Sequence, residues 1–180
     1  LTAQRDDCTL AYSVLCTVNG EYERADEILR AHRFHTYEGG EGNLTQHHAW
    51  LRYLSAVRAL KAGNTAEAEK LLCDGLVFPE NYGEEKNYFV NDAPIYLTLA
   101  EIESARGDTE AAKRHLVLAD STKGAPTVHS YFQCEALRRM GREEDARALA
   151  ASLRKIGETK IANAAVNDYY GVGAPAYPPF

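Results

Sequence analysis

Four histidines stand close together in the first third of the sequence, and an imidazole is a common ligand of transition metals. They are His32, His35, His47 and His48. His32 and His35 are three positions apart and so share one face of a helix, as two metal ligands would. No acidic or cysteine partner lies at the spacing of a metal motif, however, and no HExxH sequence occurs. We therefore expect no bound metal; the alternative is a polar, partly exposed patch at a helix end, where a protonated histidine interacts favourably with the helix dipole.

Carboxylates in the segment FPENYGEEKNYFVNDAP, residues 78–94, are the second group that could do chemistry. Glu80, Glu84, Glu85 and Asp92 could form an acid–base pair, but charges like these more often make the solvated face of a loop. The sequence contains no GxSxG, no phosphate-binding glycine loop and no convincing nucleophile with its base. The glycine-rich YEGGEGN follows a helix pattern and not a strand, so it predicts a connection. The sequence thus predicts neither a catalytic site nor a cofactor.

Composition and charge restrict the class of protein. Hydrophobic residues make up 45% and charged residues 26% of the 180, as in an average globular domain, and no long apolar run predicts a membrane span. The formal net charge of −6 argues against a nucleic-acid partner, since phosphate binding needs clustered cations. The four cysteines form no CxxC pair, which favours reduced thiols in a cytoplasmic protein. The start at Leu1, without a signal peptide or an initiating Met, suggests a piece of a longer cytoplasmic chain.

The elements that would position these residues form a repeat. Four stretches align on a shared glycine: Gly20, Gly63, Gly107 and Gly141. Five residues after each glycine stands Ala25, Ala68, Ala112 or Ala146, and seven before it Ser13, Ala56, Ala100 or Cys134. Ten before it stands a large apolar residue: Leu10, Tyr53, Leu97 or Tyr131. Glycine is the residue that adopts the left-handed conformation at little cost, so each stretch predicts a helix, a glycine turn and a second helix.

Cap signals support these helices. Asn64 with Glu67 has the spacing of a capping box, and Asp108 is a good N-cap for the helix after Gly107. Pro94, after Asp92, predicts the start of the next first helix, and Pro126 predicts the start of the one after that.

This pattern resembles the tetratricopeptide repeat, whose small, glycine and alanine positions fall at these offsets. The resemblance implies an all-α superhelix, an α-solenoid of about four helix-turn-helix units in one domain. The units span residues 6–36, 49–79, 93–123 and 127–157, with a C-terminal helix near 158–168 and an extended tail in 158–180. The spacing from Gly107 to Gly141 is 34 residues, the repeat period, while the earlier spacings of 43 and 44 indicate long inter-repeat loops.

Two further stretches resemble a narrower group. LVFPENYGEEK, with Pro79, Glu80, Asn81 and Gly83, and the final AVNDYYGVGAPAYPPF are similar to the C-terminal helical-repeat region of large bacterial proteins of unknown function. Upstream, those proteins have a β-rich region resembling carbohydrate-active enzymes. The resemblance implies that this chain is a domain of a larger carbohydrate-processing protein whose catalytic residues lie upstream.

A tetratricopeptide-like superhelix would use the first helix of each unit to line its concave face. The residues expected there are Trp50, Tyr53, Val57, Leu97, Glu101, Tyr131, Glu135 and Arg138. Such a groove, aromatic at one end and of mixed charge at the other, suits a peptide or a neighbouring domain. The alternative is that Trp50, Tyr53 and Tyr131 only pack between repeats.

The aromatic loop within 78–94 also requires a role, because a disordered linker would not carry so many aromatic side chains. We expect Tyr82, Tyr88 and Phe89 to present a surface to another domain; the alternative is that the loop and tail pack within the chain and cap the array. The function predicted from the sequence is a non-catalytic protein-interaction or intramolecular scaffolding module. The alternative function is an accessory domain whose loops line a sugar-binding pocket through Trp50, Tyr82 or Tyr88.

Overall fold

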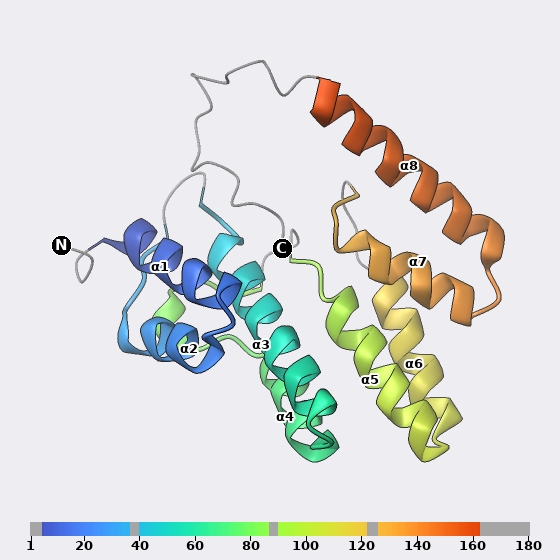
Figure 1. The fold of residues 1–180 in the computed structure, drawn as a ribbon, viewed down its shortest axis with the longest axis horizontal. Coiled ribbons are helices and arrows are strands. Elements are labelled where there is room, and N and C mark those ends of the chain that lie inside the picture. Colours follow the sequence, from blue (N-terminus) through green and yellow to red (C-terminus); the bar gives the residue numbers. More distant parts are fainter. Residues whose placement is uncertain (1–4, 37–39, 87–89, 122–125, 163–180) are drawn as a thin grey trace. The chain divides into compact units, whose positions relative to one another are not determined.

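The computed structural model describes residues 5–36, 40–86, 90–121 and 126–162, and these ranges contain α-helices and one 3₁₀ helix but no strand (Figure 1). The α-helices are α1 (Asp6–Val18), α2 (Tyr22–Ala31), α3 (Asn43–Lys61), α4 (Thr65–Asp74), α5 (Ala93–Arg106), α6 (Thr109–Asp120), α7 (Ser130–Arg139) and α8 (Glu143–Ala162). The 3₁₀ helix is η2 (Glu80–Tyr82). The prediction of an all-α chain is confirmed. No helix in the described ranges is long and apolar enough to cross a membrane.

The four repeat glycines each separate the two helices of a pair, as predicted. Their φ angles are +79° at Gly20, +78° at Gly63, +83° at Gly107 and +76° at Gly141. A Cβ added at any of them would meet nothing within 4 Å, so the left-handed backbone alone accounts for glycine there.

Small residues occupy the close approach between paired helices. The positions seven before each glycine, Ser13, Ala56, Ala100 and Cys134, are buried, and so are the alanines five after it, Ala25, Ala68, Ala112 and Ala146. None of the eight is more than 4% exposed, so neither set leaves room for a larger side chain.

The predicted caps are confirmed at two helices. Asn64 accepts a hydrogen bond from the Glu67 N–H at 3.2 Å, and Asp108 accepts one from the Ala111 N–H at 2.9 Å. At α5 the first-turn N–H of Ala93 donates instead to the side chain of Asn91, at 3.0 Å. The last predicted start is wrong: α7 begins at Ser130, four residues after Pro126.

The chain divides into two compact units, residues 1–90 and 91–180, with two helix pairs in each. In the first unit α1 packs on α2 and α3 on α4, and both α1 and α2 contact α3. In the second unit α5 packs on α6 and α7 on α8, and both α5 and α6 contact α7. The same packing order therefore occurs twice (Figure 1). The core of the second unit includes Ala93, Leu97, Ala119 and Ala136.

Two predicted boundaries are wrong. The second unit was expected to begin at residue 49, but α3 begins at Asn43 and already includes the buried His47 and His48. In place of a new helix near 158, α8 runs without a break to Ala162. Gly157 is its weakest helix former, and one glycine is tolerated within a helix of this length. Residues 163–180 lie outside the described ranges.

Candidate functional site

The segment after α4 is fixed to the first unit by a buried tyrosine. The side chain of Tyr82 in η2 is 1% exposed, and its hydroxyl lies 2.9 Å from Nδ1 of His48 in α3. The other ring nitrogen of His48, Nε2, lies 3.1 Å from the carbonyl oxygen of Asp74. Since a carbonyl can only accept, Nε2 carries the proton and Nδ1 accepts the proton of the tyrosine hydroxyl. Burial lowers the pKa of His48 from 6.5 to about 4 and raises the pKa of Tyr82, so both groups are neutral at pH 7.

Asn81, next to Tyr82, caps the end of α2. Its side-chain nitrogen donates to the carbonyl oxygens of Leu29, at 2.9 Å, and His32, at 2.6 Å. Its own carbonyl accepts from the N–H of Phe34 at 2.8 Å. Carbonyls at the C-terminal end of a helix lack hydrogen-bond donors within the helix, so Asn81 supplies the donors that α2 cannot. The segment therefore stabilises a helix about fifty residues earlier in the chain.

A series of ring contacts surrounds these hydrogen bonds. Phe34 lies edge-on to His32 and to Tyr82, with centroids 4.6 and 5.9 Å apart, and His48 lies edge-on to Tyr82 and to Phe78, at 5.4 and 5.6 Å. The expectation that Tyr82 presents a surface to another domain is wrong, because its ring and hydroxyl are both used inside the first unit. For Tyr82 the alternative, packing within the chain, is observed. Tyr88 and Phe89 lie outside the described residues.

Gly83→Ala is expected to lower the free energy of unfolding by at least about 1 kcal/mol more than Gly63→Ala. Both glycines have positive φ, +69° and +78°, so each alanine variant bears the cost of the left-handed conformation, about 1–2 kcal/mol. At Gly83, however, an added Cβ would lie 2.9 Å from the backbone oxygen of Phe34, whereas at Gly63 it would meet nothing. Urea unfolding followed by the fluorescence of Trp50, the single tryptophan, measures both variants. Equal losses of unfolding free energy in the two variants would contradict the close approach of Gly83 to the backbone of Phe34.

His47 makes a second buried contact. Ser13 donates its hydroxyl proton to the carbonyl of Ala25 at 3.0 Å, so His47 Nε2, 2.9 Å from the same hydroxyl oxygen, must carry a proton and donate. Burial, and then the proximity of His48, lower the pKa of His47 from 6.5 to about 3. The expectation of a partly exposed patch is therefore wrong for His47 and His48, which lie in the core between α1, α2, α3 and η2.

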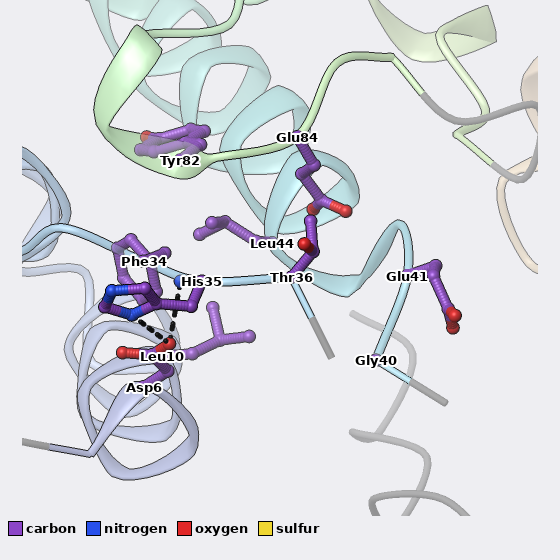
Figure 2. A pocket seen from close by; sticks show the side chains of 10 residues that line it. All are labelled: Asp6, Leu10, Phe34, His35, Thr36, Gly40, Glu41, Leu44, Tyr82 and Glu84. Atoms are coloured by element: carbon purple, nitrogen blue, oxygen red, sulfur yellow. Dashed lines mark hydrogen bonds and ion pairs between the residues drawn. The ribbon is translucent and has the colours of Figure 1, made fainter. Parts of the chain in front are cut away.

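His32 and His35 instead meet at the carboxylate of Asp6, and Figure 2 shows Asp6 beside His35. Asp6 accepts from His32 Nε2 at 2.6 Å and from the backbone N–H of His35 at 2.8 Å, and His35 Nδ1 lies 3.3 Å away. Burial alone would raise the pKa of Asp6, but the hydrogen bonds outweigh it and lower that pKa. The four histidines thus form two separate pairs.

The small cavity beside Asp6 is too small for a substrate. It is lined by Asp6, Leu10, Phe34, His35, Thr36, Gly40, Glu41, Leu44, Tyr82 and Glu84 (Figure 2). Its volume is about 20 Å³, room for about one water molecule. No group of three histidine, cysteine, aspartate or glutamate side chains in the described ranges could hold a metal ion.

A larger groove runs between α2, α3 and α4 and has a volume of about 540 Å³. It is lined by Tyr22, Glu23, Asp26, Arg52, Ser55, Arg58, Ala59, Ala62, Asn64, Glu67 and Leu71. Arg52, whose side chain is only 7% exposed, donates to Asp26 at 2.5 Å, and Asp26 also pairs with Arg30 at 2.8 Å. Arg58 lies 4.7 Å above the ring of Tyr22 and pairs with Glu23. The floor of the groove is therefore polar and fixed by ion pairs, and its rim carries both positively and negatively charged side chains.

This groove is not the one predicted on α3. Its α3 residues are Arg52, Ser55, Arg58 and Ala59, and at 100° per residue Tyr53 and Val57 lie on the side of the helix opposite to the centre of this set. Trp50 is 9% exposed and its ring lies 4.9 Å from that of Tyr53, so for these two the alternative of packing fits better.

The residues of the second unit that were predicted to line a concave face have different surroundings in the structure. Leu97 is a core residue, because it packs against the buried alanines of α6 and α7, and its place in an open groove was wrongly predicted. Tyr131 is 56% exposed and lies edge-on to Phe132. The charged residues form ion pairs: Glu101 with Arg139 at 2.5 Å, and Glu135 with Arg138.

Of these residues, Arg138 lines a second groove, of about 380 Å³, between α7 and α8. The other residues of this groove are Arg147, Ala150, Ala151, Arg154, Lys155 and Glu158. Sequence reasoning did not single out the α8 residues, although their spacing along one helix face is visible in the sequence.

Cysteine chemistry is disfavoured at the two buried thiols. Burial raises the pKa of Cys16 and of Cys134, which keeps each in the less reactive thiol form at pH 7. With His47 and His48 held neutral in structural hydrogen bonds, these buried groups serve the fold and do not form a nucleophile with its base.

No protein-family model matches the chain. No solved structure matches it either. The grooves and their side chains therefore carry the functional argument.

Proposed function

We propose that this chain is a non-catalytic binding module, built of tetratricopeptide-like helix pairs, that holds a peptide segment in the groove between α2, α3 and α4. The observation that carries the proposal is the contrast between this open groove and the buried acid–base candidates. The groove has about 540 Å³ of space in reach of solvent, within the range of ligand sites, while His47, His48 and Tyr82 are enclosed and hydrogen-bonded.

The composition of the groove favours a peptide. Arg58, which pairs with Glu23, and Glu67 line the groove at exposed positions, so side chains of either charge on a partner find a complement there. The ion pair of Arg52 with Asp26 fixes the floor before any partner arrives, which lowers the entropic cost of binding. The partner we favour is another protein or a neighbouring domain of the same, longer chain, the latter because of the resemblance to bacterial carbohydrate-processing proteins.

A sugar-binding wall is the weaker alternative. Stacking on a sugar ring needs an open aromatic face, and both Trp50 and Tyr82 have theirs covered by neighbouring side chains.

Ser55→Trp tests the groove. Ser55 lines it, and an indole there would fill the space between α2 and α4, so we expect peptides captured from a random-sequence array to bind at least about tenfold more weakly, a loss of about 1.4 kcal/mol. Lys113→Trp, at an exposed position of α6, is the matched control and should leave binding unchanged.

Thermal melting of both variants shows whether each remains folded. The proposal is contradicted if the unaltered chain captures no peptide, or if Ser55→Trp binds the captured peptides as tightly as before.

A further inference from the structure

The groove between α7 and α8 is basic although the protein as a whole is acidic. Four of its lining side chains are cationic, namely Arg138, Arg147, Arg154 and Lys155, and one, Glu158, is anionic, so the lining carries a local charge of +3. The whole chain has a formal net charge of −6. A cationic cleft on an acidic protein concentrates anionic partners at one place.

The charges in this groove are only partly neutralised. Arg147 pairs with Glu143 at 3.2 Å, and Arg138 pairs with Glu135 and lies 3.9 Å from Glu143. Arg154 and Lys155 have no ion-pair partner among the described residues. The uncompensated positive charge therefore lies on the second half of α8.

The arginines of α8 lie in a line along one face of the helix. Arg147 and Arg154 are seven residues apart, two turns of helix, and lie about 10 Å apart along the axis on one face. Ala150 and Ala151 lie between them, and their small side chains leave the floor of the groove open. In an extended peptide of the polyproline II type, which has three residues per turn and rises about 3.1 Å per residue, side chains three residues apart lie on one face and are separated by about 9 Å. Two acidic residues at that spacing would meet both arginines.

We propose that the α7–α8 groove is a second binding site and that its ligand is an acidic, extended peptide segment of a partner protein. Guanidinium groups bind carboxylates through two parallel hydrogen bonds, and Arg154, which pairs with no carboxylate in the described ranges, can do so, with Lys155 beside it as an additional cation. A nucleic acid fits less well, because four cations on a protein of net charge −6 supply little phosphate neutralisation. The site extends the proposed function and uses none of the residues of the first groove.

The probe is a fluorescein-labelled oligoglutamate peptide, with binding followed by fluorescence anisotropy at low salt. Reversing two charges with Arg154→Glu and Lys155→Glu is expected to weaken binding at least tenfold. Lys113→Glu with Arg114→Glu changes the net charge by the same amount at exposed positions of α6, and should weaken binding less than twofold. Both pairs are exposed, so circular dichroism melting should show both variants folded.

Three outcomes would overturn the proposal: no binding of oligoglutamate, equal losses in the two double variants, or tighter binding of an oligothymidylate that the α8 variant abolishes. The last would assign the groove to a phosphate backbone. Ser55→Trp should bind oligoglutamate as the unaltered chain does, so failure of the first groove and failure of this one can be told apart.

Discussion

Tyr82→Ala is expected to lower the free energy of unfolding by about 3–5 kcal/mol, and Tyr82→Phe by about 1–2 kcal/mol. The alanine variant loses a fully buried ring that packs edge-on against Phe34 and His48, and leaves a cavity in the first unit. The phenylalanine variant keeps the ring but leaves Nδ1 of His48 without the hydroxyl proton it accepts. The difference between the two variants separates ring packing from the hydrogen bond.

Trp50 lies in α3, the helix that carries His48, so its fluorescence reports unfolding of the unit that contains Tyr82. Tyr12→Ala is the matched control: the same substitution in the same unit, at a side chain 44% exposed, should cost about 1 kcal/mol or less. If Tyr82→Ala and Tyr12→Ala shift the urea midpoint equally, the burial of Tyr82 is contradicted.

The segment from Phe78 to Glu84 thus has a structural role that its length explains. A short turn could join α4 to the next helix, but it could not reach back to cap α2 with Asn81, bury Tyr82 under α3 and pass Gly83 against the backbone of Phe34. In the described part of this loop, the aromatic and glycine residues serve the stability of the first unit.

Features fixed by local geometry could be predicted from the sequence. A helix that ends in a left-handed residue needs glycine, and two closely packed helices need small side chains, so Gly107 and Ala112 stand at a fixed offset. Asn64 and Asp108 were predictable as caps because each cap joins residues three apart.

Contacts across long stretches of sequence could not be predicted. Tyr82 and His48 are 34 residues apart, and Asn81 and Leu29 are 52 apart, and nothing in a helix pattern pairs them. One signal was present: the glycine after Asn-Tyr is typical of a tight turn, and Gly83 does have the left-handed backbone that such a turn requires.

The sequence also did not predict which face of α3 lines the groove. A repeat template assigns the ligand side of α3 to Tyr53 and Val57, whereas the groove follows Arg52 and Ser55 on the opposite side. A buried arginine such as Arg52 has no sequence signal of its own, because its burial depends on Asp26 in another helix.

Mild acid is expected to destabilise the protein steeply between pH 6.5 and pH 4. His47 and His48 are held neutral in the fold, with pKa values lowered to about 3 and about 4, and each returns to 6.5 when the chain unfolds. In this window the unfolded chain binds more protons than the folded one, so stability falls as the pH falls, by about 1.4 kcal/mol per pH unit for each histidine. His48 alone accounts for roughly 3 kcal/mol over that range.

Other charges near these histidines do not reverse this sign. Arg52 and Arg30 oppose protonation of His48, Asp26 and the Asp74 carbonyl favour it, and burial exceeds them all. Asp6 acts in another window: its pKa is lowered below 3.8, so the stability it contributes is lost only as the pH falls further.

Replacing both histidines with glutamine should remove most of this acid dependence. A glutamine at 48 keeps an acceptor for the Tyr82 hydroxyl and a donor for the Asp74 carbonyl, but it cannot be protonated in this range. Urea unfolding at pH 7, 6, 5 and 4 should give a steep loss for the unaltered chain and a shallow one for the His47→Gln, His48→Gln variant. His35→Gln, at a side chain 78% exposed, should retain the steep loss. A flat profile in the unaltered chain would mean that these two imidazoles are hydrated in the fold, and the buried hydrogen bonds to Ser13 and Tyr82 would then be wrong.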